Sequence, residues 1–270
     1  MLAYSHISAS RVGDLMNRAL AAMGDFADLV SPCFVGHSAG VALLAMNAAR
    51  HCNFDIGDVA TIRRAALVHD IGRVAVPARI WRQPGPLTPD DWEKVRLHPY
   101  QTERILHRSP FLAVLAEVAG AHHERCDGSG YHRGTAAPGL TGSARLLAAA
   151  DAYQTKIEQR PHREPLTPQQ AAETLASEVK AGRLDAVAVR AVVEAAGQRT
   201  RPIEGPAGLT QRETAVIRLL ARGLQTKQIA RALGISVKTA DNHIQNAYSK
   251  IGVSTRAAAA VFAMQHGLVP

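Results

Sequence analysis

Three features are scarce or missing in this chain of 270 residues. Aromatic side chains make up only 4% of it, and its three cysteines, Cys33, Cys52 and Cys126, are isolated from one another. An odd number of scattered cysteines excludes a disulfide framework and a cysteine-bound zinc clip. No stretch approaches the ~18 uninterrupted apolar residues of a membrane span. The first residues also lack the basic segment followed by an apolar one that is typical of a signal peptide. We therefore expect a soluble, cytoplasmic protein with no membrane contact.

The positive charge of the chain is concentrated towards its C-terminal end. Residues 209–270 carry eight basic against two acidic side chains, a net charge of +6, whereas residues 1–208 carry +2. Nucleic acid is the natural partner of such a basic module. Two prolines and three glycines interrupt helical periodicity over residues 197–208. The sequence thus predicts a first domain over residues 1–196, a linker over 197–208 and a basic module over 209–270.

Helical periodicity dominates the rest of the chain. Alanine, leucine, glutamate, glutamine and arginine recur in periodic segments, and strand-like alternation is missing, which predicts an all-α fold. Capping residues or first-turn prolines predict helix starts at Thr88, Pro99, Thr167 and Asp185. In the basic module we expect four short helices that start at Thr210, Thr226, Ser236 and Ser254, with glycines as stops.

Several histidines and carboxylates fall on the apolar faces of separate predicted helices. His37 shares a face with Val41 and Leu44, and the pair His69 and Asp70 ends another apolar stretch. The same pattern places His122 and Asp151 towards the core. A single inward histidine is usually an ordinary core residue, but buried polar groups must find partners or metal. The combination suits a dinuclear site, in which a carboxylate bridges two ions ~3.5 to 4 Å apart.

Five motifs then recur in order along the first domain. They are HSAGVA (37–42), AALVHDIGRVAVPARIWRQPGPLTPDDWEKVRLHP (65–99), HHERCDGSGYH (122–132), ARLLAAAD (144–151) and RPHREPLT (160–167). Together they resemble the HD-GYP family over residues 30–180. The resemblance implies a helical bundle of the HD-domain superfamily and a metal-dependent phosphodiesterase that hydrolyses cyclic di-GMP.

The resemblance also implies roles for individual residues. One divalent ion, iron or manganese, would be held by His37, His69, Asp70 and Asp151, and a second by His98, His122 and His123, with Asp70 as the bridge. Asp70 and Arg73 would be catalytic, Arg73 standing where the family has lysine. The residues implied in binding the cyclic dinucleotide substrate are Gly128, Gly130, Tyr131, Arg160 and Arg163.

The chain departs from the HD-GYP pattern at three further places. His132 replaces the proline of GYP, and Gln154 replaces the second aspartate of DxxDAL. Cys33 stands four residues before His37, where trinuclear members have glutamate, so we expect two ions and not three. Two alternatives stay open: a non-catalytic domain that senses a nucleotide or mediates association, and hydrolysis of a different phosphate ester.

The basic module resembles a LuxR-type helix-turn-helix domain through LTQRE, IARALGIS and KTADNHIQNAYSKIGVSTR. Its third helix is expected from Val237 to about Ile251, and its last from Thr255 to His266. The resemblance implies a DNA-reading face on double-stranded DNA that comprises Lys238, Thr239, Asn242, Gln245, Asn246 and Lys250. It also implies a homodimer through the last helix. Because such a domain binds DNA, the resemblance further implies that the protein is a transcriptional regulator. Asp241 stands where the family often has a basic residue, so near phosphates it should weaken binding or select a register.

Overall fold

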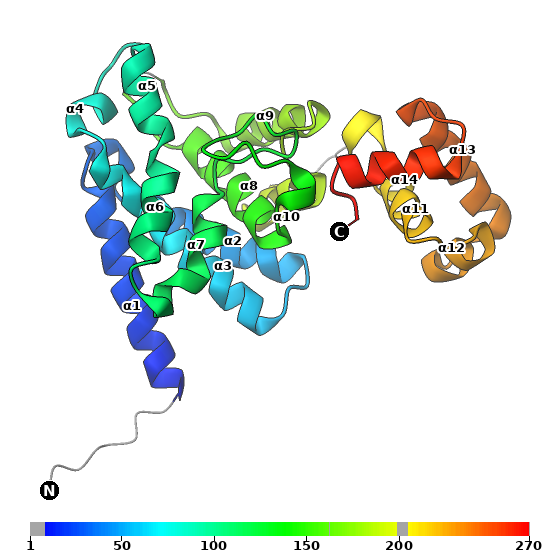
Figure 1. Ribbon diagram of the computed structural model, residues 1–270, viewed down its shortest axis with the longest axis horizontal. Helices are drawn as coiled ribbons and strands as arrows, with labels where there is room; N and C mark the ends of the chain where they lie inside the picture. The colour runs from blue at the N-terminus through cyan, green and yellow to red at the C-terminus, as the bar shows by residue number, and fades with distance from the viewer. Residues whose placement is uncertain (1–8, 162, 199–204, 270) are drawn as a thin grey trace, which may run out of the picture.

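The computed structural model describes residues 9–161, 163–198 and 205–269 (Figure 1). In these ranges the chain forms α-helices and short 3-10 turns and has no strand; one isolated bridge joins Arg160 and Arg163. The predicted all-α fold is confirmed. Of the predicted linker over residues 197–208, residues 199–204 lie outside the described ranges, so its boundaries stay a prediction.

Ten helices build the described part of the first domain. They are α1 (Ala9–Asp28), α2 (His37–His51), α3 (Ile56–Val68), α4 (Ala78–Trp81), α5 (Pro89–Arg96), α6 (His98–Leu106), α7 (Pro110–Gly120), α8 (Gly142–Ile157), α9 (Pro168–Lys180) and α10 (Ala186–Ala195). Three 3-10 turns join them, η1 (Pro32–Phe34), η2 (Ile71–Ala75) and η3 (Ala137–Gly139).

The core of the first domain lies around α2, which packs against α3, α8 and α10. Ala45, Ala48 and Ala49 of α2 and Ala149 of α8 are fully buried. Such small side chains let helix axes approach closely, because the distance between packed helices depends on the side chains at the contact. Larger side chains such as Leu147 fill the space between the helices.

Most predicted helix starts are confirmed. The side chains of Thr88, Thr167 and Asp185 each accept a hydrogen bond from a backbone N–H in the first turn of the helix that follows. Helix α6 begins at His98, one residue before the predicted Pro99. This displacement places the proline in the first turn, where its missing N–H costs no hydrogen bond.

The basic module folds into four helices after a 3-10 turn, η4 (Pro206–Gly208), as predicted. They are α11 (Gln211–Ala221), α12 (Thr226–Leu233), α13 (Val237–Ile251) and α14 (Arg256–Gln265). Thr210 and Ser236 are N-caps as predicted, but the N-caps of α12 and α14 are Gln225 and Thr255. The predicted start at Thr226 is thus the first residue of α12, whereas the start predicted at Ser254 is wrong by one residue. Thr255 accepts a hydrogen bond from the backbone of Ala258 at the N3 position, which makes it the cap.

The C-terminal segment of the basic module lies against the first domain. The guanidinium of Arg145, on α8, donates to the carbonyls of Ala137, Leu140 and Gly267. Gly267 has a φ of +60°, and a Cβ there would lie 2.6 Å from the Cβ of Ala137. Only glycine therefore fits this close approach.

One helical stretch in the described part of the chain, Pro32–His51, is long and apolar enough to cross a membrane by length and composition. Half of it is buried inside the protein, where it forms η1 and α2. This is the pattern of a core helix.

Candidate metal centre

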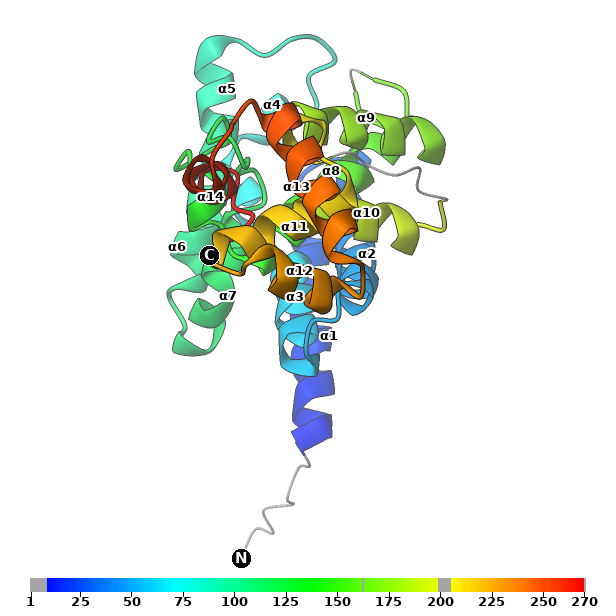
Figure 2. The same ribbon diagram turned by 90° about the vertical axis from the view of Figure 1, so that its right-hand side faces the viewer.

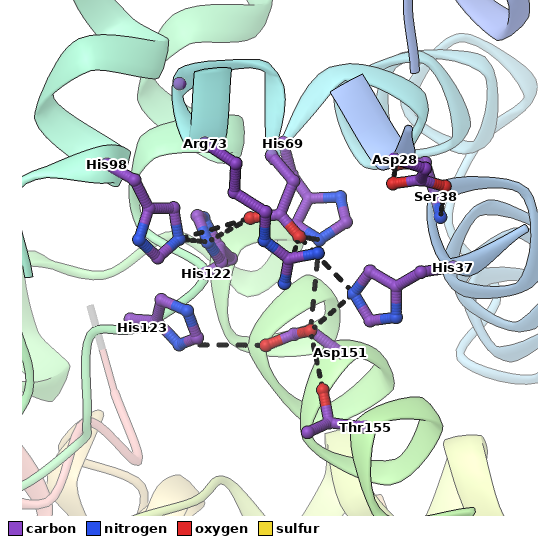
Figure 3. Close-up of polar contacts among 12 residues, drawn as sticks. Asp28, His37, Ser38, His69, Arg73, His98, His122, His123, Asp151 and Thr155 are labelled. Carbon is purple, nitrogen blue, oxygen red and sulfur yellow. Dashed lines mark hydrogen bonds and ion pairs between the residues drawn. The ribbon is translucent and has the colours of Figure 1, made fainter. Parts of the chain in front are cut away.

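All seven predicted metal ligands converge on one place in the first domain (Figure 3). They come from the start of α2, the turn after α3, the start of α6, the turn after α7 and the middle of α8. Two groups form, with ligand atoms within 4.8 Å of one another in each. One group is His37, His69, Asp70 and Asp151, and the other is His98, His122 and His123. The division matches the two ligand sets implied by the sequence.

Asp70 lies between the two groups and offers one oxygen to each. Its Oδ2 lies 3.3 Å from the Nε2 of His37 and 2.9 Å from that of His69. Its Oδ1 lies 3.1 Å from the Nε2 of His98 and 3.3 Å from that of His122. A carboxylate in this position can bridge two ions.

Backbone carbonyls fix the orientation of three of the histidine rings. The Nδ1 atoms of His69, His98 and His122 lie 2.6 to 2.7 Å from the carbonyl oxygens three residues earlier. A neutral ring that donates from Nδ1 presents the lone pair of Nε2 to the site, which is the form that binds metal. The Nε2 atoms of His98 and His122 lie 3.0 Å apart. Two lone pairs at this distance need a cation between them.

Several polar atoms in the centre have no hydrogen-bond partner although they are fully buried. They include the Nε2 atoms of His37 and His69 and both carboxylate oxygens of Asp70. The Nε2 atoms of His37 and His69 lie 3.3 and 2.9 Å from the Oδ2 of Asp70. Unsatisfied buried groups are costly, and metal coordination would satisfy them. The donor set of imidazoles and carboxylates therefore fits divalent transition metals.

Electrostatic contacts keep both carboxylates ionised. Burial alone would raise the pKa of Asp70, but Arg73 and His69 hold that pKa well below its usual range. Burial likewise opposes ionisation of Asp151, but the close contact with the Nε2 of His37, 3.2 Å from its Oδ1, keeps its pKa well below the usual range. Both side chains thus remain in the anionic form that a metal ligand requires.

The histidines differ in protonation. Burial lowers the pKa of His122 to about 4 and holds that of His123 well below its usual range, so both are neutral at pH 7. Burial would also lower the pKa of His37, but the surrounding carboxylates, Asp151 first, raise it to about 10. A metal ion that binds His37 would therefore displace a proton.

A buried threonine joins the turn that carries His69 and Asp70 to α6, which carries His98. The hydroxyl of Thr102 donates to the carbonyl of His69 and accepts from the backbone N–H of Gly72. A Cβ at Gly72 would lie 2.0 Å from the carbonyl oxygen of His98, so the turn and α6 are in direct backbone contact. This contact fixes the position of His69 and Asp70 relative to His98, and so of one ligand group relative to the other.

Arg73 lies at the edge of the centre and is almost fully buried. Its Nη2 lies 2.5 Å from the Oδ2 of Asp70, while its Nε and Nη1 are buried without a partner. The guanidinium stacks on the ring of Phe34 at 4.1 Å, and that of Arg160 stacks on the same ring at 4.7 Å. Two cations thus share one aromatic platform beside the centre. The unpartnered Nε and Nη1 of Arg73 suit an anionic group such as a phosphate.

The sequence did not reveal Glu158 as part of the centre. Its Oε2 lies 2.8 Å from the Nδ1 of His37, and it also accepts from Gln154 and Arg160. A carboxylate on the outer nitrogen of a ligand histidine fixes the ring and raises its basicity. A weak signal was available, because Glu158 follows Asp151 by seven residues and so shares its helical face.

The predicted substrate residues lie at different distances from the ligands. The ring of Tyr131 packs on that of His123, with centroids 4.7 Å apart. A Cβ at Gly130 would lie 2.5 Å from the backbone of Glu124, so this close turn requires glycine. Gly128 lies further along the loop, beside Gly134. The structure thus brings Tyr131 and Gly130 to the centre and leaves Gly128 outside it.

The two predicted phosphate-binding arginines have structural partners. Arg160 donates to the carbonyl of Cys33 and to Glu158. Arg163 donates to the carbonyls of Thr155 and Lys156, at the C-terminal end of α8. Basic side chains near the last carbonyls of a helix stabilise its end. Their roles in substrate binding stay predictions.

All six predicted DNA-binding residues lie exposed on α13. The opposite face of this helix, with Ala240, Ile244 and Ala247, is buried against the core of the module. Lys250 differs from the other five, because its ammonium contacts Glu213 at 2.8 Å and the carbonyl of Gly208. Contact with a phosphate would require Lys250 to leave this pair.

Two family descriptions match the chain. Residues 21–187 match the HD domain, and residues 207–263 match the luxR family of bacterial regulatory proteins. A solved structure of a HDG"Y"P protein from Bdellovibrio bacteriovorus has a similar fold, with a TM-score of 0.53 at 16% identity. The similarity covers 68% of this chain and 64% of that one.

Curated relatives match parts of the first domain. A 3'3'-cGAMP-specific phosphodiesterase 3 from Vibrio cholerae is 40% identical over 143 residues, or 53% of this chain and 31% of the relative. A cyclic di-GMP phosphodiesterase from Thermotoga maritima is 42% identical over 109 residues, or 40% of this chain and 30% of the relative. The chain thus spans about a third of the length of these relatives. From the domain match and the ligand geometry, the chain belongs to the HD domain family and carries a LuxR-type domain after it.

Proposed function

We propose that the protein is a transcriptional regulator whose first domain is a metal-dependent phosphodiesterase for cyclic di-GMP. The observation that carries the proposal is the position of Asp70, which offers one oxygen to each of two histidine groups. Two relatives with about 40% identity bear names of cyclic dinucleotide phosphodiesterases. The predicted cytoplasmic location suits both a nucleotide substrate and DNA.

The residues of the centre would hold two divalent ions, iron or manganese, through the two ligand groups. Such ions, when bound, supply an activated water and neutralise the charge of a phosphodiester. The chain's own contribution is to orient the imidazoles through backbone carbonyls and to keep Asp70 anionic. Arg73 would bind a phosphate oxygen through its unpartnered Nε and Nη1. Tyr131, stacked on His123, would limit the space for the nucleotide.

The basic module would bind double-stranded DNA through the exposed face of α13. Lys238, Asn242 and Gln245 suit phosphates and base edges in the major groove. Helix α14 would pair two copies for two half-sites about one helical turn apart. Its exposed Val261 and Met264 offer an apolar contact for this homodimer.

A second candidate function is that of a non-catalytic nucleotide sensor. Its support is the ion pair between Arg73 and Asp70, which places a fixed positive charge on the bridging carboxylate. In that case the first domain would bind a cyclic dinucleotide without cleaving it, and DNA control would be the sole output.

Turnover of a substrate panel distinguishes the two functions. Manganese- or iron-loaded protein would be incubated with cyclic di-GMP, 3'3'-cGAMP, other cyclic dinucleotides and phosphomonoesters. We expect hydrolysis of cyclic di-GMP by the wild-type protein and by the control His51→Ala, whose exposed ring lies outside the centre. Asp70→Ala should be inactive. Binding of cyclic di-GMP without any hydrolysis would instead establish the sensor.

A further inference from the structure

Helix α1 has two apolar stripes, and only one of them is covered. Met16, Leu20 and Ala27 pack against the first domain. The second stripe faces solvent along α1 and the turn after it, and its larger side chains are 48 to 67% exposed. It consists of Val12, Leu15, Ala19, Ala22, Phe26 and Leu29. Figures 1 and 2 both show α1 extending past the rest of the domain.

The spacing of this second stripe is that of a coiled-coil seam. Its members are separated alternately by three and four residues, the heptad pattern in which a helix presents one seam to a partner helix. An exposed set of apolar side chains in a continuous line also marks an association surface. The stripe therefore fits a second helix of the same kind.

Two charged residues flank the stripe along one edge. Arg18 and Asp25 stand one heptad apart, each directly before a seam residue, Ala19 or Phe26. In the part of the chain that the structure describes, neither side chain has a hydrogen bond or ion pair within the protein. Residues at such flanking positions set the orientation of paired helices.

We infer that the exposed stripe of α1 binds the same stripe of a second copy in antiparallel orientation. This register pairs large with large and small with small side chains: Val12 with Leu29 of the second copy, Leu15 with Phe26, and Ala19 with Ala22. It also brings Arg18 opposite Asp25 of the second copy, twice by symmetry. A parallel register would place Arg18 opposite Met23 instead, without an ion pair.

Charge reversal in the full chain tests this interface. Arg18→Asp and Asp25→Arg each replace two attractive pairs with two repulsive ones, so each should weaken dimerisation by at least roughly tenfold in sedimentation equilibrium without DNA. The double variant Arg18→Asp/Asp25→Arg should restore the wild-type dissociation constant. Thermal unfolding should be the same in all four proteins when it is measured at a concentration at which all of them are monomeric, because both positions are exposed. A double variant as weak as the single ones would overturn the antiparallel register.

Apolar substitutions separate this interface from α14. Without DNA, Phe26→Glu should yield monomers, whereas the matched control Phe111→Glu, at another exposed phenylalanine, and Met264→Glu on α14 should leave the dimer intact, because the pairing proposed for α14 forms on two DNA half-sites. Loss of the dimer in Met264→Glu alone would overturn the inference in favour of α14. A wild-type protein that stays monomeric and binds anionic phosphatidylglycerol vesicles through Phe26 would overturn it in favour of a lipid surface.

Discussion

The Nε2 atoms of His98 and His122 lie 3.0 Å apart, and both rings direct Nδ1 to a backbone carbonyl. Neither ring then has a hydrogen left to share between the two Nε2 atoms. The two side chains come from the start of α6 and the turn after α7, and these two helices pack against each other in the fold. The protein thus positions the two lone pairs for a cation through its backbone.

Metal content should follow the two ligand groups. Wild-type protein purified anaerobically should hold two ions per chain, and His122→Ala, which removes a ligand of one group, should hold one. Asp70→Ala removes the bridge and its negative charge, so it should hold almost none. Elemental analysis gives these numbers, with His51→Ala as a control that keeps both ions. Three tightly bound ions in the wild type would contradict the role inferred for Cys33.

Glu158 should strengthen metal binding although it lies outside the ligand groups. Glu158→Gln keeps the size of the side chain but removes the negative charge next to the Nδ1 of His37. Loss of such an outer partner typically weakens metal affinity by about 10- to 100-fold. Competition with a chelator measures this affinity, and Glu164→Gln, at an exposed glutamate nearby, is the matched control. Equal affinities of both variants would show that Glu158 only stabilises the fold.

The ion pair of Glu213 with Lys250 should make the basic module sensitive to acid. Burial would raise the pKa of Glu213, but contacts with Lys250 and Thr210 lower it below its usual 4.5. The pKa of Glu213 is therefore lower in the folded than in the unfolded protein. The ion pair stabilises the fold fully above the unfolded pKa, and this stabilisation is lost as the pH falls through the folded pKa.

Glu213→Gln should therefore destabilise the module by about 1 kcal/mol at pH 7. The difference from wild type should begin to shrink as the pH falls below the unfolded pKa of about 4.3, and it should be lost once the pH is below the lowered folded pKa, where the wild-type carboxylate is protonated as well. Amide hydrogen exchange in α11, followed by mass spectrometry, reports on this module within the full chain. A difference that is equally large at both pH values would assign the effect to the capping hydrogen bond.

Charge changes on α13 should alter DNA affinity in opposite directions. Lys238→Ala should weaken binding and reduce the slope of log affinity against log salt by about 0.9, the value for one lost phosphate contact. Asp241→Asn should tighten binding, because it removes a negative charge from the face that is predicted to meet DNA. Binding to a fixed duplex at several salt concentrations measures both effects, with Glu173→Gln on α9 as the control. Tighter binding by that control would show a general charge effect.

Local patterns allowed much of the fold to be predicted from the sequence, whereas the two ligand groups were implied by the resemblance to the HD-GYP family. Apolar periodicity placed His37 and Asp151 towards the core, and capping residues located the helix starts to within one residue. The contact between Glu158 and His37 was not predictable in this way, because 121 residues separate them along the chain. The role of Thr102 likewise depends on the packing of α6 against η2, which no local pattern encodes.

The close contact at Gly267 limits how freely the two domains can be recombined. A side chain at this position would collide with Ala137 and with the guanidinium of Arg145, which lies on the same helix as Asp151. A different LuxR-type module joined to this HD domain would need glycine at the equivalent place to dock in the same way. The two halves of the chain are therefore matched parts, and domain exchange in protein engineering would have to preserve this small contact.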